Sequence, residues 1–300
     1  MPLTLEDLND YRAGTFRTRP GMRIKSPEEA VEYVNERGFI FFWPMKNVLM
    51  PSLWTAVAGD RPVADEHDDP GHITWGWKDS MLGKRRWYYG RVMRKRNTII
   101  SLDLLPYFYA LSPNYGDPNE DYLIDYEQGL MTNGAKQIYE ALLQAGPQDT
   151  IALRKSAGMT SRAADSEFNR ALEELQSSFR ILPVGVSEAG AWNYAFIYDI
   201  VARHFPDLIE RAHPISEAQA RQALIGSYLK SVGAVPYKEV RRMFGLQPLN
   251  WDPVVIERDL RKMEERGEIC QGVEIKGLKE PHIVSQALFA ACSESGKNAP

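Results

Sequence analysis

Two stretches of this chain repeat the same order of amphipathic helices, and this repeat restricts the fold more than any other feature of the sequence. In each stretch a short helix ends at a glycine, Gly158 or Gly245, and a longer helix follows. Counted from the glycine, the apolar positions are Phe168, Leu172 and Leu175 at +10, +14 and +17, and Ile256, Leu260 and Met263 at +11, +15 and +18. Spacings of three and four residues place them on one helix face, so both stretches are expected to bury that face in the same way.

Each of these longer helices is followed by two short segments that are typical of β-strands. They span residues 181–186 and 192–198 in the first stretch, and 269–275 and 281–284 in the second. Glu188-Ala189-Gly190 supplies a turn in the first, and Gly277 supplies one in the second. A further helix precedes each pair of helices, starting near Ala135 and near Ser216. Three helices followed by a hairpin predict a winged helix-turn-helix in both stretches.

The N-terminal part of the chain carries a less regular version of the same pattern. Ser26, with Glu29 three residues later, forms a capping-box pattern and predicts a helix over residues 26–37. Helices near 50–58 and 75–82 follow, and then strands near 86–92 and 98–102. We interpret this part as a third, embellished winged helix. The predicted fold is therefore mainly α with short β-hairpins, an α+β class, in three tandem winged helix-turn-helix modules.

The predicted modules divide the chain into five segments. Residues 1–111 form the N-terminal module, and residues 112–133 a connecting helix and linker that contains the stretch Ser112 to Pro118, rich in turn-forming residues. The second module covers 134–205 and the third 206–292. Residues 293–300 are expected to be a flexible tail.

Composition narrows the class of protein. No apolar run is long enough to span a membrane, and the first residues lack the pattern of a secretion signal, so we expect no membrane partner and a cytoplasmic or nucleoid-associated protein. Cys270 and Cys292 are too few for a disulfide framework and are not spaced as a zinc site. No nucleotide-binding glycine loop is present, and we expect neither a metal nor another cofactor.

One short segment, residues 84–96, is strongly basic. It holds seven basic residues and no acidic one, so the net charge of −4 is the sum of +7 in this segment and −11 elsewhere. The basic residues are Lys84, Arg85, Arg86, Arg91, Arg94, Lys95 and Arg96. Local positive charge of this kind is typical of proteins that contact DNA phosphates, and we predict that these residues bind DNA. The interleaved Trp87, Tyr88 and Tyr89 either stack on bases or belong to the core.

The third helices of the two later modules are poor candidates for reading DNA sequence. The first exposes Asp165, Glu167, Glu173 and Glu174 against Arg162 and Arg170. The second balances Arg258, Arg261, Lys262 and Arg266 with four acidic residues. We interpret both helices mainly as scaffold.

The loop from Asp65 to His72 is the stretch whose residue types favour catalysis or metal binding. Carboxylates and imidazoles at short spacing bind cations or transfer protons, which makes Asp68, Asp69 and His72 candidate catalytic residues. The stretch lacks the spacing of an HExxH or EF-hand site. Acidic loops that contain proline and glycine are also common as solvent-exposed turns and helix caps.

With three modules predicted, two N-terminal segments resemble a known family. The run ERGFIFFWPMKNVL from Glu36 to Leu49, followed by Pro51-Ser52-Leu53-Trp54, is similar to the opening of the AlkZ/YcaQ-type winged-helix family. The run from Trp75 to Leu82, WGWKDSML, is similar to that family's Trp-Gly-His-Glu-Ala-Ser-x-Leu. The resemblance covers about residues 26–275. It implies a relationship to bacterial DNA glycosylases that unhook crosslinks and remove alkylated bases.

The same comparison shows where this chain departs from the family. Members carry two polar residues, the first a Gln, that position the water attacking the sugar C1′, and anchoring on Asn47-Val48 places those two positions at Phe42 and Pro44. Neither side chain orients a water molecule. Trp77-Lys78 stands where the family has His-Glu. The residues that the resemblance places around the nucleotide pocket are Phe42, Trp43, Pro44, Trp75 and Trp77.

Three functions remain open at this point. The first is a DNA-binding protein, directed to DNA structure or damage, that lacks the usual glycosylase residues and binds double-stranded or damaged DNA. The second is an active, divergent DNA glycosylase whose water is activated by Asp68, Asp69, Asp79 or His72. The third is a protein-interaction scaffold, which burial of the segment 84–96, or its neutralisation by Asp65 to Asp69, would favour.

Overall fold

The computed structural model describes residues 2–114, 116–190 and 193–295. Within them, one order of elements occurs three times: a helix, a short strand, two helices and two further strands. Unit 1 comprises α2 (Pro27–Arg37), β1 (Phe39–Phe41), α3 (Leu53–Ala58), α4 (Ile73–Met81), β2 (Tyr88–Arg91) and β3 (Asn97–Ile100). Unit 2 comprises α7 (Asn133–Ala145), β4 (Gln148–Asp149), α8 (Thr150–Ser156), α9 (Asp165–Ser177), β5 (Ile181–Ser187) and β6 (Ala195–Ile200). Unit 3 comprises α12 (Glu217–Val232), β7 (Ala234–Val235), α13 (Tyr237–Phe244), α14 (Pro253–Glu265), β8 (Ile269–Val273) and β9 (His282–Ser285).

The three units also share one sheet topology. Each has a three-stranded antiparallel sheet in which the last strand lies between the other two, in the orders β1-β3-β2, β4-β6-β5 and β7-β9-β8. The short first strand of each unit follows its first helix, and the sequence predicted none of these three strands. The predicted α+β class is confirmed, and the element order matches that of the predicted modules.

Helix ends in the structure follow local capping chemistry. The Ser26 side chain accepts a hydrogen bond from the backbone N–H of Glu29 at the start of α2, as the capping-box pattern predicts. Ser216 and Gln219 form a complete capping box at the start of α12. Strand β6 begins at Ala195, three residues later than predicted, and Trp192 lies outside the described residues.

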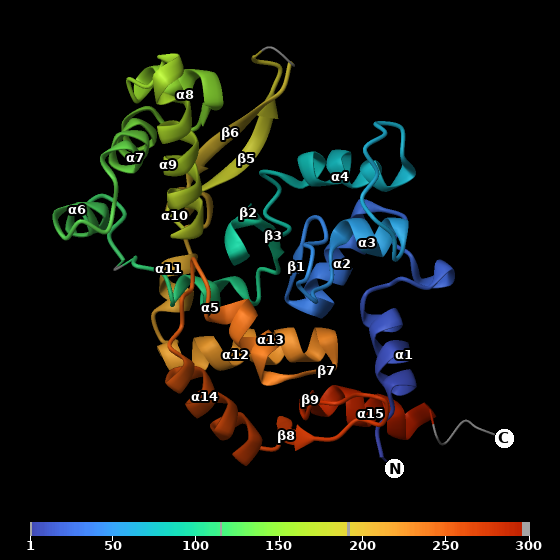
Figure 1. Cartoon of the computed structure of the whole chain (residues 1–300). Coiled ribbons are helices and arrows are strands. Elements are labelled where there is room, and N and C mark those ends of the chain that lie inside the picture. The colour runs from blue at the N-terminus through green and yellow to red at the C-terminus, as the bar shows by residue number, and fades with distance from the viewer. Residues whose placement is uncertain (1, 115, 191–192, 296–300) are drawn as a thin grey trace.

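The largest hydrophobic core is shared by all three units. It includes Phe39 and Tyr88 from unit 1, Phe179 from unit 2, and Tyr228 and Leu260 from unit 3. A second cluster fills unit 2, a third lies within unit 1, and a fourth joins the two chain ends. Figure 1 shows unit 1 next to both other units, with the hairpin β2–β3 near the middle of the molecule. The tip of this hairpin is therefore held by neighbours from two sides.

The remaining helices connect the units and join the chain ends. They are α1 (Leu5–Thr15), α5 (Leu105–Tyr109), α6 (Asp121–Glu127), α10 (Val201–His204), α11 (Leu208–Ala212) and α15 (Gln286–Ser295). Helix α1 packs against α12 and α15 (Figure 1). Arg12 donates hydrogen bonds to the carbonyls of Val232 and Ala234. The sequence did not predict α1. Helix α15 extends through Ser295 into the segment predicted as a tail, and residues 296–300 lie outside the described residues. Within the described ranges, no helix combines the length and apolar character needed to cross a bilayer.

Candidate nucleic-acid interface

A pocket of about 310 Å³ opens where the chain leaves β1. Its lining comes from the loop that follows β1 and from the β2–β3 wing: Phe42, Trp43, Pro44, Met45, Lys46, Arg96 and Asn97. Three residues that the family resemblance placed around the nucleotide thus lie beside Arg96 of the basic segment. Phe42 itself is buried, whereas Trp43 and Pro44 are exposed. Lys46 and Asn97 were not predicted as members of this site.

Exposed aromatic rings border this pocket. Trp43 and Trp75 are 37% and 40% exposed, high values for tryptophan, and their ring centroids lie 5.7 Å apart. Trp43 stacks on Phe42 at 5.6 Å and on the His72 imidazole at 6.0 Å. These contacts hold the Trp43 ring in place while part of it still faces solvent. Exposed and immobilised aromatic rings beside cations are suited to stacking on nucleic-acid bases.

Behind Trp75, a buried lysine joins unit 1 to the wing of unit 2. The Lys78 side chain on α4 is fully buried, and its Nζ lies 2.6 Å from Asp79 Oδ1 and donates to the Tyr194 hydroxyl at 2.8 Å. The ammonium also lies 4.4 Å from the ring centroids of both Trp75 and Phe196. Figure 1 shows the β5–β6 hairpin, which carries these unit 2 residues, beside α4.

Besides their direct hydrogen bond, Lys78 and Tyr194 are also connected through the Asp79 carboxylate. The Tyr194 hydroxyl donates to Asp79 Oδ1 at 2.9 Å, so both contacts of the carboxylate use Oδ1 and neither uses Oδ2. Burial lowers the pKa of Lys78, and the contact with Asp79 opposes this effect. Burial raises the pKa of Tyr194, and its hydrogen bond to Asp79 raises it further. The cluster therefore favours the protonated form of Tyr194.

The basic residues of the segment 84–96 divide into two groups. Lys84, Arg85 and Arg86 lie in the turn between α4 and β2, and all three are exposed. This turn packs closely against unit 2, because a Cβ on Gly83 would lie 2.6 Å from the Val184 carbonyl oxygen, and Gly83 has a φ of +76°. Within the described residues, no ion pair connects the basic segment to Asp65, Glu66, Asp68 or Asp69. The neutralisation that would have favoured the scaffold function is thus not seen in this part of the chain.

The second basic group lies on the wing between β2 and β3, and part of it faces the neighbouring units. Lys95 Nζ lies 3.0 Å from Glu173 of α9, and Arg91 lies 4.0 Å from the same carboxylate. Arg94 donates a hydrogen bond of 2.7 Å to the carbonyl of Arg242 on α13. Arg91, Lys95 and Arg96 are exposed, whereas Arg94 is half-buried. Arg94 therefore has a structural role that the other three do not share.

The aromatic residues within the basic segment belong to the core. Trp87, Tyr88 and Tyr89 are each less than 5% exposed. Tyr88 packs in the core shared by the three units, and Trp87 and Tyr89 pack on the other face of β2 in the core of unit 1. Trp77, which the resemblance placed around the pocket, is also buried in the core of unit 1. In this conformation none of these four rings is available for stacking.

The acidic loop has mainly structural contacts. Asp69 accepts hydrogen bonds from Arg61, at 2.6 Å, and from the backbone N–H of Gly71. The hydrogen bond from Arg61 lowers the pKa of Asp69. His72 Nε2 contacts the Ala64 carbonyl at 2.9 Å, and Asp68 is exposed. In the described part of the chain, no three His, Cys, Asp or Glu side chains converge as metal ligands would.

Comparisons with known proteins agree with this architecture. A family model described as "AlkZ related" matches residues 24–245. The solved structure of the Streptomyces sahachiroi DNA glycosylase AlkZ is similar, with a TM-score of 0.60 and 13% sequence identity, over 98% of this chain and 73% of that chain. No curated protein matches the chain by sequence. Because the family model covers most of the chain, including the whole of the pocket and the Lys78 cluster, this protein belongs to the AlkZ-related family.

Proposed function

We propose that this protein binds double-stranded or damaged DNA and acts in DNA repair without the water-positioning residues of the family's glycosylases. The observation that carries the proposal is the shared pocket of Trp43, Lys46 and Arg96, where an exposed ring and two cations meet. Cations supply the attraction to phosphates, and the ring supplies a surface for an unstacked base. The family membership supports DNA as the partner, since the similar solved structure is a DNA glycosylase.

The residues at the two expected catalytic positions support binding rather than hydrolysis at this pocket. Phe42 offers no hydrogen-bonding group on its side chain and is buried against Trp43. Pro44 has no side-chain heteroatom and lacks a backbone N–H as well. A hydrolytic water needs at least one acceptor to orient it for attack. The pocket is therefore suited to holding a base, and we propose that it does so without cleaving the glycosidic bond at these two positions.

Replacing Trp43 with alanine tests the stacking part of this proposal. A base stacked on an aromatic ring contributes about 1–3 kcal/mol, so we expect W43A to bind duplex DNA that contains an abasic site or a mismatch roughly tenfold more weakly. The dependence of affinity on salt should not change, because no cation is removed. Fluorescence anisotropy of labelled duplexes at several salt concentrations measures both quantities. L246A removes a side chain that is 46% exposed on unit 3 and serves as the control. Absence of binding by the wild-type protein at low salt would contradict the proposal.

The Lys78–Asp79–Tyr194 cluster favours a second candidate function, a divergent DNA glycosylase. Among the candidate catalytic residues, Asp79 is held by Lys78 and Tyr194 through its Oδ1 atom. Its Oδ2 atom takes part in neither of these contacts. Asp69 is tied to Arg61, and His72 is packed beneath Trp43. Asp79 is therefore the best placed of these residues to accept a proton from water.

Incubation with alkylated or crosslinked duplex DNA, followed by detection of abasic sites, distinguishes the two functions. If Asp79 is a general base, wild-type protein should release bases and D79N should be about 10²- to 10⁴-fold slower. D60N is the matched control, because Asp60 is an exposed carboxylate in the loop that follows α3 and is not one of the candidate catalytic residues. Lack of product from the wild-type protein across the lesions, together with intact DNA binding, would reject the enzyme and retain the binding protein.

A further inference from the structure

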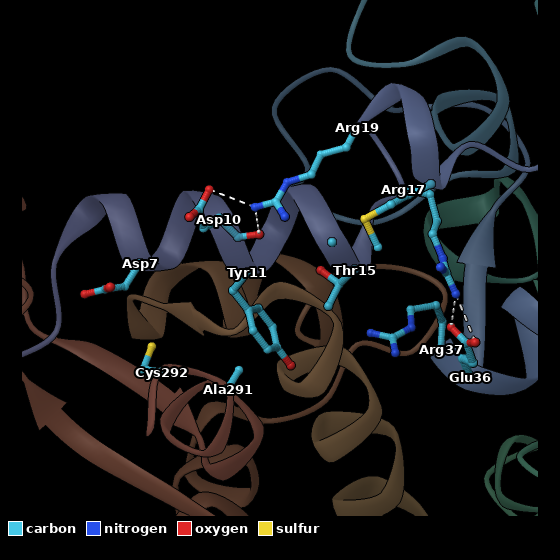
Figure 2. A pocket seen from close by; sticks show the side chains of 12 residues that line it. Asp7, Asp10, Tyr11, Thr15, Arg17, Arg19, Glu36, Arg37, Ala291 and Cys292 are labelled. Carbon is cyan, nitrogen blue, oxygen red and sulfur yellow. Dashed lines mark hydrogen bonds and ion pairs between the residues drawn. The ribbon is translucent and has the colours of Figure 1, made fainter. Parts of the chain in front are cut away.

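A second pocket, of about 440 Å³, lies where α1, α2 and α15 meet (Figure 2). Two of these three helices, α1 and α15, lie outside the residues that match the family model. The residues that matter for its chemistry are Tyr11, Thr15, Arg17, Arg19, Arg37 and Cys292. This site is thus formed largely by the two ends of the chain and is separate from the pocket around Trp43.

The acidic side chains of this pocket are already engaged. Glu36 forms an ion pair with Arg17 at 2.7 Å, and Asp10 forms one with Arg19 at 2.8 Å. Both arginines use only Nη2 in these contacts, which leaves N–H groups for another acceptor. Asp7 accepts hydrogen bonds from Thr4 in the capping box of α1. Figure 2 shows Asp7 at the opposite end of the pocket from Arg37.

Arg37 is the cation of this pocket that lacks a counter-charge among the described residues. Its Nε and Nη1 atoms are shielded from solvent and have no hydrogen-bond partner, and no ion pair to the described residues involves its guanidinium. The backbone at Arg37 is fixed, since its carbonyl accepts a hydrogen bond of 2.6 Å from Ser227. Arg37 as a residue is only half-buried, but its guanidinium keeps two buried nitrogens whose N–H groups have no acceptor, which is unfavourable and points to an anion that this cation binds.

The two hydroxyl groups beside Arg37 in this pocket donate their hydrogen bonds to backbone carbonyls. The Tyr11 hydroxyl donates to the Lys230 carbonyl at 2.6 Å, and the Thr15 hydroxyl donates to the Ser231 carbonyl at 2.7 Å. An incoming acceptor therefore meets arginine N–H groups rather than hydroxyl protons. Met22, Ala291 and Cys292 add apolar surface to the pocket lining.

We propose that this pocket binds a small organic molecule carrying a phosphate or carboxylate group, with Arg37 as its counter-charge and Arg17 and Arg19 beside it. Guanidinium groups match the geometry of both oxyanions, and the volume lies in the range of small-molecule sites. The apolar part of the lining contacts the rest of the molecule. The proposal is independent of DNA binding at the first pocket.

Calorimetric titration of the full-length protein with inorganic phosphate, adenosine 5′-monophosphate and succinate tests the proposal and separates the two oxyanions. We expect saturable binding of at least one probe, weakened about tenfold or more in R37Q. R258Q removes an exposed arginine from α14 and controls for net charge. Thermal melting without probe shows whether each variant is folded.

A second variant tests the site without removing a charge. Gly14 lies in α1 on the pocket wall, and a Cβ there would meet only Met22 Cε, at 4.0 Å. G14L should fill the pocket, keep the helix intact and abolish probe binding. The proposal is overturned if the wild-type protein binds none of the probes at about 10 mM, a concentration that saturates even weak sites, or if R37Q and G14L bind as tightly as wild type. Displacement of the bound probe by duplex DNA would also overturn it, because the pocket would then belong to the DNA backbone.

Discussion

Changing Arg91, Lys95 and Arg96 together to alanine should weaken binding to duplex DNA by about two to three orders of magnitude near 0.1 M salt. All three side chains are exposed on the wing between β2 and β3, and Arg96 lines the pocket beside Trp43. Each phosphate contact contributes about 0.9 to the slope of log affinity against log salt, so three lost contacts lower the slope by roughly 2.7. Anisotropy titrations over a range of salt concentrations measure the slope and the affinity together.

The triple variant leaves Arg94 in place because its hydrogen bond to the Arg242 carbonyl holds the wing against unit 3. R258A/R261A/K262A removes the same charge from exposed positions on α14 and is the matched control. We expect this control to bind almost as tightly as wild type, since acidic neighbours balance these residues. E173Q should strengthen binding several-fold, because Glu173 competes with phosphates for Lys95 and Arg91. If both triple variants lost equal affinity, net charge would explain the binding and the wing would have no special role.

The fold could be predicted to a large extent because short-range rules determine it. The spacing after Gly158 and Gly245 indicated α9 and α14, and Phe168, Leu172, Ile256 and Leu260 are all buried as that spacing requires. The two glycines nevertheless differ. Gly158 has a φ of +70°, in the left-handed region that favours glycine. Gly245 has an ordinary φ of −84°, but a side chain there would collide with the preceding helix, since a Cβ would lie 2.8 Å from the Arg241 carbonyl oxygen. Equal position in a repeat therefore does not mean equal conformation.

The candidate site was harder to predict because its parts come from different units. Lys78 and Asp79 are adjacent in sequence, but Tyr194 and Phe196 reach them from the wing of unit 2. A single sequence gives no signal for contacts between residues more than a hundred positions apart. Long-range packing, rather than local propensity, brings this cluster together.

Burial could not be decided from the sequence where a strand is covered on both faces. The sequence left open whether the rings of residues 87–89 stack on bases or pack inside, and alternation along a strand suggests one face in and one face out. Here β2 is packed on one face by the core shared by the three units and on the other by the core of unit 1, so Tyr88 and Tyr89 are both buried. Near the pocket the exposed rings are instead Trp43, which lines it, and Trp75, whose ring contacts Trp43.

Replacing Asp259 with alanine should destabilise the protein by about 3–5 kcal/mol, the typical effect of breaking a buried ion pair by removing one partner. Asp259 on α14 is fully buried and accepts hydrogen bonds from Arg221 Nε at 2.6 Å and from Gln222 Nε2 at 3.0 Å, both on α12. Without the carboxylate, the Arg221 guanidinium, whose side chain is 8% exposed, keeps its charge without its buried partner. Urea unfolding followed by far-ultraviolet circular dichroism measures the change in the free energy of unfolding.

Glu217 provides a matched control on the same arginine. It pairs with Arg221 at 3.2 Å, but its side chain is 78% exposed, so E217A should cost less than about 1 kcal/mol. The double variant R221M/D259L replaces the buried charges by apolar groups and should recover most of the stability lost in D259A. Equal effects of D259A and E217A would contradict this account and would mean that burial does not set the strength of the pair. A large difference, with recovery in the double variant, would show that the pairing of one buried cation, Arg221, with Asp259 holds α12 and α14 together.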